Sequence, residues 1–329
     1  MEVLDVQSLG FEASETLLFR VNEVPDTPQE WAENLHQIFP AVLGELAIGG
    51  PRLIEHPDPN IAYSMQRRSD GSQWRDWWAG DHFWHVDGTR WPVQPVLTGS
   101  VCKEAAGPVP GTELLDTVKL LQISLDDKFW AKRGLNDHDL DYLKVIFADS
   151  TYQRQAMPYL RPFMTQQEQD RLQQITAIDI AKANAELLGA GVDRTLTSDE
   201  DLADYIDEKY PPKEFHLIRT TPFSGHDSLF LDAGGRAAEL VDLDTRQDMT
   251  SILRDFRWEY LAGDTPRRLG LTSIVDWEPG VGVIFPQVGT LHRALPGNDV
   301  DRSLHLAFLS QARFSALPNF PAPPAVFVK

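Results

Sequence analysis

The feature that most constrains the fold of this chain is the position of its two strand-rich regions. Residues 81–101 are rich in aromatic residues and valine with little helical periodicity, so we expect strands there. Strand patterns return in "VDWEPGVGVIFPQVGTLHRAL" and "RSLHLAFLS", whereas residues 137–188 between the two regions have a helical pattern. This order predicts a β-sandwich or barrel whose run of strands is interrupted by a helical insertion.

Shorter patterns predict helices and a hairpin around this core. In "DTPQEWAENLHQIF", Thr27 and Glu30 have the spacing of a capping box, so a helix is expected there. The helical insertion is expected to stop at Gly189, and residues 245–261 form another predicted helix. "EFHLIRTTPFSGHDSLFLD" predicts two strands around a turn at Ser224-Gly225.

An acidic stretch follows the helical insertion. Residues 190–213, which contain "GVDRTLTSDEDLADYIDEKYPPK", close on a double proline and hold at most a short helix. They are either a solvated surface excursion or a lid over a binding site, because long irregular insertions often serve as lids. We therefore expect a single domain over residues 1–329, with a helical and lid-like insertion at about 137–213.

Composition excludes several classes of partner. The formal net charge is −19, and such a field repels nucleic acid and an anionic membrane surface. Cys102 is the only cysteine, which fits a reducing compartment. The sequence shows no secretory signal and no apolar run of about 18 residues, the length a spanning helix needs. We expect a cytoplasmic protein with a small-molecule substrate; the sequence leaves its oligomeric state open and is compatible with a homo-oligomer.

The run "HFWHVDGTRW" carries the first candidate site. On a strand, side chains two residues apart share a face, so His85 and Asp87 point one way while Trp84 and Val86 point the other. An imidazole and a carboxylate on one face are two of the three ligands in a 2-His-1-carboxylate metal site. The other interpretation is a hydrogen-bonded pair within an aromatic-rich strand.

Two later stretches add groups of the right kind. "PVPGTELLDT" contains Thr112, and "WEPGVGVIFPQVGTLHRALPGNDVDRSLHLAF" contains His292 and, ten residues later, Arg302. A third ligand, a hydroxyl and a guanidinium are what an iron(II)/2-oxoglutarate site needs. Other interpretations are an ordinary strand histidine, a turn threonine and an arginine in a surface ion pair. Arg293 competes with Arg302 for the anion-binding role, but it should point away from the metal if His292 points toward it.

Taken together, these segments resemble the taurine/2,4-dichlorophenoxyacetate dioxygenase (TauD/TfdA) family, in the clavaminate-synthase-like group of oxygenases. "FWHVDGTRWPVQP" resembles the first ligand motif of that family, "GTELLDT" its Gly-Thr-Glu segment, and "HLIRTTPFSGHDSLFLD" its middle hairpin. "WEPG", "LHRA" and the arginine that follows are similar to its second ligand motif. The resemblance covers most of the chain, with the four segments in the family order.

The resemblance implies a fold, a ligand set and a reaction. The fold is a mixed α/β structure with a mainly β core, a double-stranded β-helix (jelly-roll, cupin-like) with flanking helices. Iron(II) is bound by His85, Asp87 and His292, while Thr112 and Arg302 hold the far carboxylate of the cosubstrate 2-oxoglutarate. With O2, such an enzyme oxidises an unactivated C–H bond by hydroxylation or desaturation and releases succinate and CO2, here in the tailoring of a small metabolite.

The chain departs from the family at one position. Members that act on sulfonates or chlorophenoxyacetates carry a second arginine four residues after the cosubstrate arginine, where this chain has Leu306. Leucine cannot bind an anion, so we expect a larger or less acidic substrate than taurine. Trp78, Trp84 and Trp91 either line a bigger pocket or belong to the core.

Two other functions remain open from the sequence. A zinc-dependent hydrolase uses the same kind of 2-His-1-carboxylate site, but it would leave Thr112 and Arg302 without a role. A non-catalytic barrel-fold binding protein is the second, although the ligand set is intact. The sequence identifies neither the substrate nor the stereochemistry.

Overall fold

The structure, a computed structural model, confirms a mixed α/β protein whose core is mainly antiparallel β-sheet. It describes residues 2–8, 16–28, 30–31, 34–35, 62–67, 84–89, 95–105, 109–147, 166–209, 211–221, 224–232, 237–295 and 302–310. Within these ranges, every pair of neighbouring strands is antiparallel. No helix in the same ranges combines the length and the apolar composition that crossing a bilayer requires.

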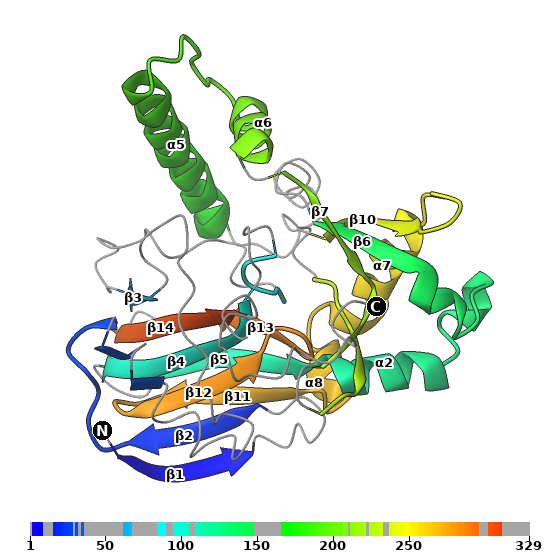
Figure 1. The fold of residues 1–329 in the computed structure, drawn as a ribbon, viewed down its shortest axis with the longest axis horizontal. Coiled ribbons are helices and arrows are strands. Elements are labelled where there is room, and N and C mark those ends of the chain that lie inside the picture. Colours follow the sequence, from blue (N-terminus) through cyan, green and yellow to red (C-terminus); the bar gives the residue numbers. More distant parts are fainter. Residues whose placement is uncertain are drawn as a thin grey trace, which may run out of the picture.

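The larger sheet interleaves strands from both ends of the chain (Figure 1). In spatial order its strands are β1 (Val3–Ser8), β2 (Leu17–Val21), β12 (Val281–Pro286), β4 (Pro95–Ala105), β14 (Arg302–Ser310) and β3 (Ala62–Arg67). The region predicted as strands over 81–101 contains a regular strand from Pro95 onward. Before it, residues 84–89 form only a β-bridge and a turn, which matters for the site.

A smaller sheet packs against the first. Its order is β11 (Thr272–Trp277), β5 (Val109–Asp116) and β13 (Thr290–Ala294). Apolar side chains from both sheets form one buried cluster: Cys102, Leu114, Val275, Trp277, Val281, Val283, Phe285, Leu304, Leu306 and Phe308. Within the smaller sheet, Gly111 on β5 lies so close to β11 that a Cβ would collide with the carbonyl oxygen of Val275. The shared cluster shows that the two sheets pack on each other through an apolar core.

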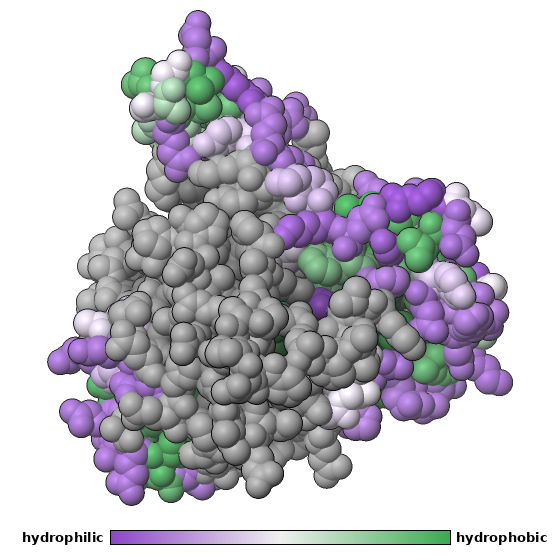
Figure 2. Space-filling model, viewed as in Figure 1, coloured by the Kyte–Doolittle hydropathy of each residue, from purple (hydrophilic) through white to green (hydrophobic). Residues whose placement is uncertain are grey.

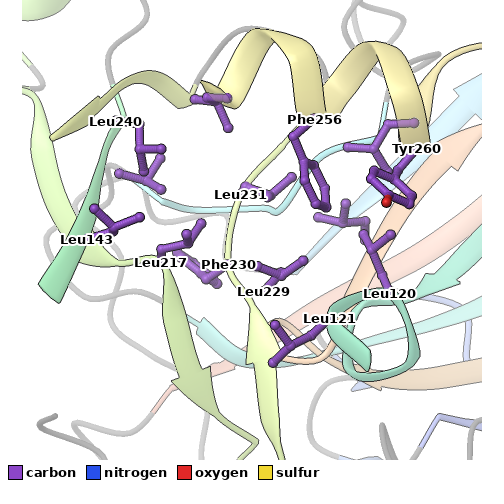
Figure 3. Packing of buried hydrophobic residues seen from close by; sticks show 14 of the residues in the cluster. Leu120, Leu121, Leu143, Leu217, Leu229, Phe230, Leu231, Leu240, Phe256 and Tyr260 are labelled. Carbon is purple, nitrogen blue, oxygen red and sulfur yellow. The ribbon is translucent and has the colours of Figure 1, made fainter. Parts of the chain in front are cut away.

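A second core lies beside this sandwich, between short strands and helices (Figure 3). A three-stranded sheet has the order β10 (Ala237–Asp242), β6 (Leu143–Phe147) and β7 (Lys213–His216), and β8 (Ile218–Thr220) pairs with β9 (Asp227–Leu229). The helices here are α2 (Thr117–Asp126), η4 (Ala131–Arg133), η5 (Asp139–Tyr142), α7 (Thr250–Phe256), its π-helical continuation η8 (Arg257–Leu261) and α8 (Thr265–Arg268). Leu120, Leu143, Leu217, Leu231 and Phe256 converge in this core.

The helical prediction for residues 137–188 is wrong at β6. This strand, "LKVIF", pairs with both β7 and β10. Its buried residues alternate, with Leu143, Val145 and Phe147 fully buried, which is the period of a strand rather than of a helix. Five residues are too few for this period to stand out beside the longer helical pattern that follows.

The later part of that region forms a helical hairpin, α5 (Gln166–Gly189) and α6 (Asp199–Lys209), which projects from the body (Figure 1). The predicted stop at Gly189 is confirmed, and the acidic stretch holds one short helix as expected. The two helices share a small buried cluster of Ala183, Leu187, Leu196 and Leu202. Much of the surface visible on this projection is hydrophilic (Figure 2). A lid role for it stays a prediction.

Two local predictions are confirmed in detail. The capping box is formed, because the Glu30 amide donates to Thr27 Oγ1 at 3.1 Å and the Thr27 amide donates to Glu30 Oε2 at 3.2 Å. The hairpin of β8 and β9 turns at Gly225, which has φ 71°. The helix predicted over 245–261 begins later, at Thr250, because residues 243–245 form a turn.

Candidate metal centre

The main chains of His85 and His292 bring two distant segments together. They form an isolated antiparallel bridge in which each residue donates its amide to the carbonyl of the other, at 3.0 and 3.1 Å. Paired residues of such a bridge present their side chains on the same face. The two imidazole rings accordingly lie together, with centroids 4.1 Å apart.

Asp87 completes a cluster of three groups. Its Oδ2 lies 3.2 Å from His292 Nε2, and its Oδ1 lies 3.7 Å from His85 Nε2. One ligand atom from each of the three residues lies within 4.8 Å of the other two. The structure thus brings together the three residues predicted as metal ligands, although metal binding itself stays a prediction.

The spacing and chemistry of this cluster fit a metal ion. Two ligand atoms about 2.1 Å from a shared ion and at right angles to each other lie about 3 Å apart. The separations of 3.2 and 3.7 Å from Asp87 are close to this value. Two imidazoles and one carboxylate on one side of an ion form the 2-His-1-carboxylate triad, which suits iron(II) and leaves positions open. All three residues are at least half-buried, with His85 only 4% exposed.

The alternation predicted for this segment holds although the strand is not regular. Trp84 and Val86 are both 1% exposed and belong to the second core, whereas His85 and Asp87 turn toward His292. Trp84 is therefore a core residue. Trp78 and Trp91 lie outside the described residues.

A tight turn places the carboxylate. Residues 87–89 form the turn, and Gly88 has φ 66°, a left-handed conformation that side chains with a Cβ rarely adopt. The Asp87 amide donates to Gln287 Oε1 at 3.0 Å, and Gln287 Nε2 donates to the hydroxyl of Thr98 on β4. Sequence reasoning missed Gln287; the only signal was an amide in the apolar run "VGVIFPQVGTL".

The environment of His292 is mainly apolar. The ring of Phe285 lies 5.0 Å away, centroid to centroid. While Nε2 faces Asp87, Nδ1 is buried and makes no hydrogen bond within the described ranges. Metal-binding histidines usually donate this second N–H to a partner that fixes the ring. In this part of the chain, packing and the main chain must orient His292 instead.

Thr112 lies on the same sheet as His292. Strands β5 and β13 pair His292 with Leu114 and Ala294 with Thr112, so Thr112 is two residues along from the partner of His292. Trp277 Nε1 donates to Thr112 Oγ1 at 3.3 Å. Because the hydroxyl oxygen accepts this bond, its own proton can be donated to an anion.

Arg302 is the first residue of β14, on the larger sheet, where its main chain pairs with Ala105. Its side chain lies outside what the structure describes, so its predicted role stays a prediction. Leu306, on the same strand, is buried in the cluster between the two sheets.

The competing arginine has a different partner. Arg293 pairs with Glu113 across β13 and β5, and its Nε donates to Glu113 Oε2 at 2.8 Å. Glu113 also accepts two bonds from Arg267, at 2.6 and 3.0 Å. Arg293 thus occupies the face opposite His292, as strand alternation predicted.

No protein-family model matches the chain, and no curated protein matches it. Among solved structures it is similar to AAD-2 in complex with Mn(II) and N-oxalylglycine, at 16% identity, 70% coverage of this chain, 60% of that chain and a TM-score of 0.42. It is also similar to a taurine dioxygenase from Burkholderia xenovorans, at 14% identity, 90% and 76% coverage and a TM-score of 0.47. The chain thus covers less than two thirds of AAD-2. Similarity at this level does not assign an activity to this chain.

Proposed function

We propose that this protein is an iron(II)- and 2-oxoglutarate-dependent oxygenase built on a double-stranded β-helix. The observation that carries the proposal is the meeting of His85, Asp87 and His292 at one point, from segments far apart in the chain. Two facing antiparallel sheets with a shared apolar core suit this fold.

The three side chains would hold the iron. When bound, the iron supplies the oxidising chemistry, with O2 and 2-oxoglutarate consumed and succinate and CO2 released. The carboxylate of Asp87 and the two imidazoles provide a charge of −1, which suits a divalent cation. The turn at Gly88 and the hydrogen bond from the Asp87 main-chain amide to Gln287 Oε1 hold the backbone that carries this carboxylate.

Thr112 and Arg302 are the proposed holders of the far carboxylate of 2-oxoglutarate. The Thr112 hydroxyl accepts from Trp277 and keeps its own proton to donate to an anion. A guanidinium offers a fixed, bidentate and permanently charged partner for a carboxylate. The mutual pairing of Arg293 and Glu113 leaves Arg302 as the better candidate of the two arginines.

The substrate is proposed to be a small organic molecule that lacks a compact strong anion. Leu306 is apolar and buried between the sheets, so it offers no charge to a sulfonate. We propose oxidation of an unactivated C–H bond, by hydroxylation or desaturation, in the tailoring of such a metabolite.

A zinc-dependent hydrolase is the second candidate, because the same three ligands suit zinc. Turnover separates the two. With iron(II), O2 and 2-oxoglutarate, the purified protein should form succinate, at a rate that rises with an accepted substrate. Zinc should not support this reaction, and Asp87→Ala should abolish it. If the iron-loaded protein forms no succinate and does not bind 2-oxoglutarate, the proposal fails and the result favours a non-catalytic binding role.

A further inference from the structure

Behind the two histidines, an arginine stacks on a tryptophan. Trp84 precedes His85 and Arg293 follows His292, so continuing the antiparallel bridge by one residue sets Trp84 opposite Arg293. Arg293 Cζ lies 4.2 Å from the centroid of the Trp84 ring. Each member of this stack is the sequence neighbour of one predicted metal ligand.

A buried carboxylate fixes the arginine from its other side. Glu113 Oε2 accepts from Arg293 Nε at 2.8 Å and lies 2.7 Å from its Nη2, and the Glu113 side chain is fully buried. Burial raises the pKa of Glu113. The hydrogen bond from Arg267 and the positive charge of Arg293 have the larger, opposite effect, so the pKa lies below its usual value. The anchor is therefore an ionised carboxylate, and Arg293 is held between it and the indole.

The two histidines come from different segments, and the described bridge between these segments consists of two main-chain hydrogen bonds. His292 is also held by the pairing of β13 with β5, whereas residues 84–89 form only the bridge and a turn. His292 Nδ1 makes no hydrogen bond within the described ranges, so the usual second contact that fixes a metal-binding imidazole is not seen there. Neighbouring side chains of extended backbone point to opposite faces, so holding Trp84 and Arg293 on one face holds the backbone in the conformation that directs the two histidines to the other.

We propose that Arg293 is a positioning residue for the metal centre, acting through its stack on Trp84 and its ion pair with Glu113. The inference rests on the proposed function, because it concerns the same three ligands. It adds that metal affinity depends on a guanidinium that does not touch the metal.

The chain supplies a matched control. Arg267 binds the same carboxylate with two hydrogen bonds but comes from α8 and is not paired with Trp84 in any described contact. Lysine keeps the charge of either arginine while it loses the planar, bidentate geometry. Each substitution weakens the bonds between that arginine and Glu113, but only Arg293→Lys also weakens the stack on Trp84.

The test measures the dissociation constant of Mn(II) by calorimetry and the visible spectrum of the Co(II)-loaded protein. Melting temperature and circular dichroism serve as checks of folding. Arg293→Lys should weaken Mn(II) binding about 10- to 100-fold, the usual effect of losing a residue that orients a ligand, and should alter the Co(II) spectrum. Arg267→Lys should lower the melting temperature while leaving both metal readouts unchanged.

A second pair of variants keeps the test decisive if Arg293→Lys does not fold. Trp84→Leu should lose Mn(II) affinity as Arg293→Lys does. Trp84→Phe should keep most of the wild-type affinity, because an aromatic face remains for the guanidinium. Equal Mn(II) affinity in wild type and Arg293→Lys would overturn this inference but not the proposed function. Equal losses of Mn(II) affinity in Arg293→Lys and Arg267→Lys would do the same. If the wild-type protein bound no Mn(II), the proposed function would fail as well.

Discussion

The backbone amide of Asp87 donates to the side chain of Gln287 at 3.0 Å, and the other end of that side-chain amide donates to Thr98. The orientation of the amide is thereby defined, because its oxygen faces a donor and its nitrogen faces a hydroxyl. A buried glutamine thus connects the turn that carries Asp87 to strand β4 of the larger sheet.

The first prediction concerns this glutamine. Gln287→Leu leaves the Asp87 amide without its acceptor, so we expect metal binding to weaken about 10- to 100-fold. The free energy of unfolding should fall by about 1–3 kcal/mol, the cost of an unsatisfied buried donor. Calorimetric titration with Mn(II) and chemical denaturation measure the two effects.

Thr98 provides the control for Gln287. Thr98→Ser keeps the hydroxyl and should bind metal as the wild type does, whereas Thr98→Val removes it and should weaken binding in the same direction as Gln287→Leu. Unchanged Mn(II) affinity in Gln287→Leu would show that this amide does not position Asp87.

The second prediction concerns the left-handed turn. Gly88→Ala introduces a Cβ at φ 66°, which costs about 1–2 kcal/mol and favours a different backbone conformation for the turn. Metal affinity should therefore fall together with stability. Gly134→Ala is the matched control, since Gly134 also has positive φ, at 83°, and a Cβ there meets no atom within 4 Å. Gly134→Ala should lose a comparable free energy of unfolding and keep the wild-type Mn(II) affinity. Equal Mn(II) affinities in Gly88→Ala and Gly134→Ala would refute the role of the turn.

The sequence predicted the three residues of the cluster better than the residues that support them. Alternation, which depends only on neighbouring residues, placed His85 and Asp87 on one face and Trp84 and Val86 on the other, and the family resemblance added His292. Gln287 escaped notice because its role depends on a contact between segments far apart in the chain. No local pattern records such a contact.

The helix and strand predictions show the same contrast between local sequence patterns and contacts that are distant in the chain. The capping box at Thr27 and the helix end at Gly189 depend on local chemistry, and both are found as expected. Strand β6 was predicted as helix because five residues are too few to show a strand period, and its pairing with the distant β7 and β10 leaves no local signal.

The third prediction concerns acid stability. The folded-state pKa of Glu113 is below its ordinary value of 4.5, so the unfolded state takes up this proton first as the pH falls. The stabilisation from the ionised carboxylate is complete above pH 4.5 and is lost as the pH falls toward the folded pKa. The difference in unfolding free energy between wild type and Glu113→Gln should therefore shrink below pH 4.5, as measured by denaturation of the metal-free proteins. A difference that stays constant or grows on acidification would contradict this assignment.

The fourth prediction concerns the substrate. Because Leu306 is buried and apolar, taurine should not stimulate 2-oxoglutarate consumption above the rate without substrate. Succinate release, measured with and without taurine, checks this. Strong stimulation by taurine that Leu306→Ala abolishes would show that the position contributes to sulfonate binding after all.

The most direct test of the central claim is an anaerobic titration with iron(II) followed by 2-oxoglutarate, monitored by visible absorption. A weak charge-transfer band should appear in the wild-type protein at one iron per chain, and it should be missing in His85→Ala. A wild type that shows no band, or a band that persists unchanged in His85→Ala, would contradict a centre formed by His85, Asp87 and His292.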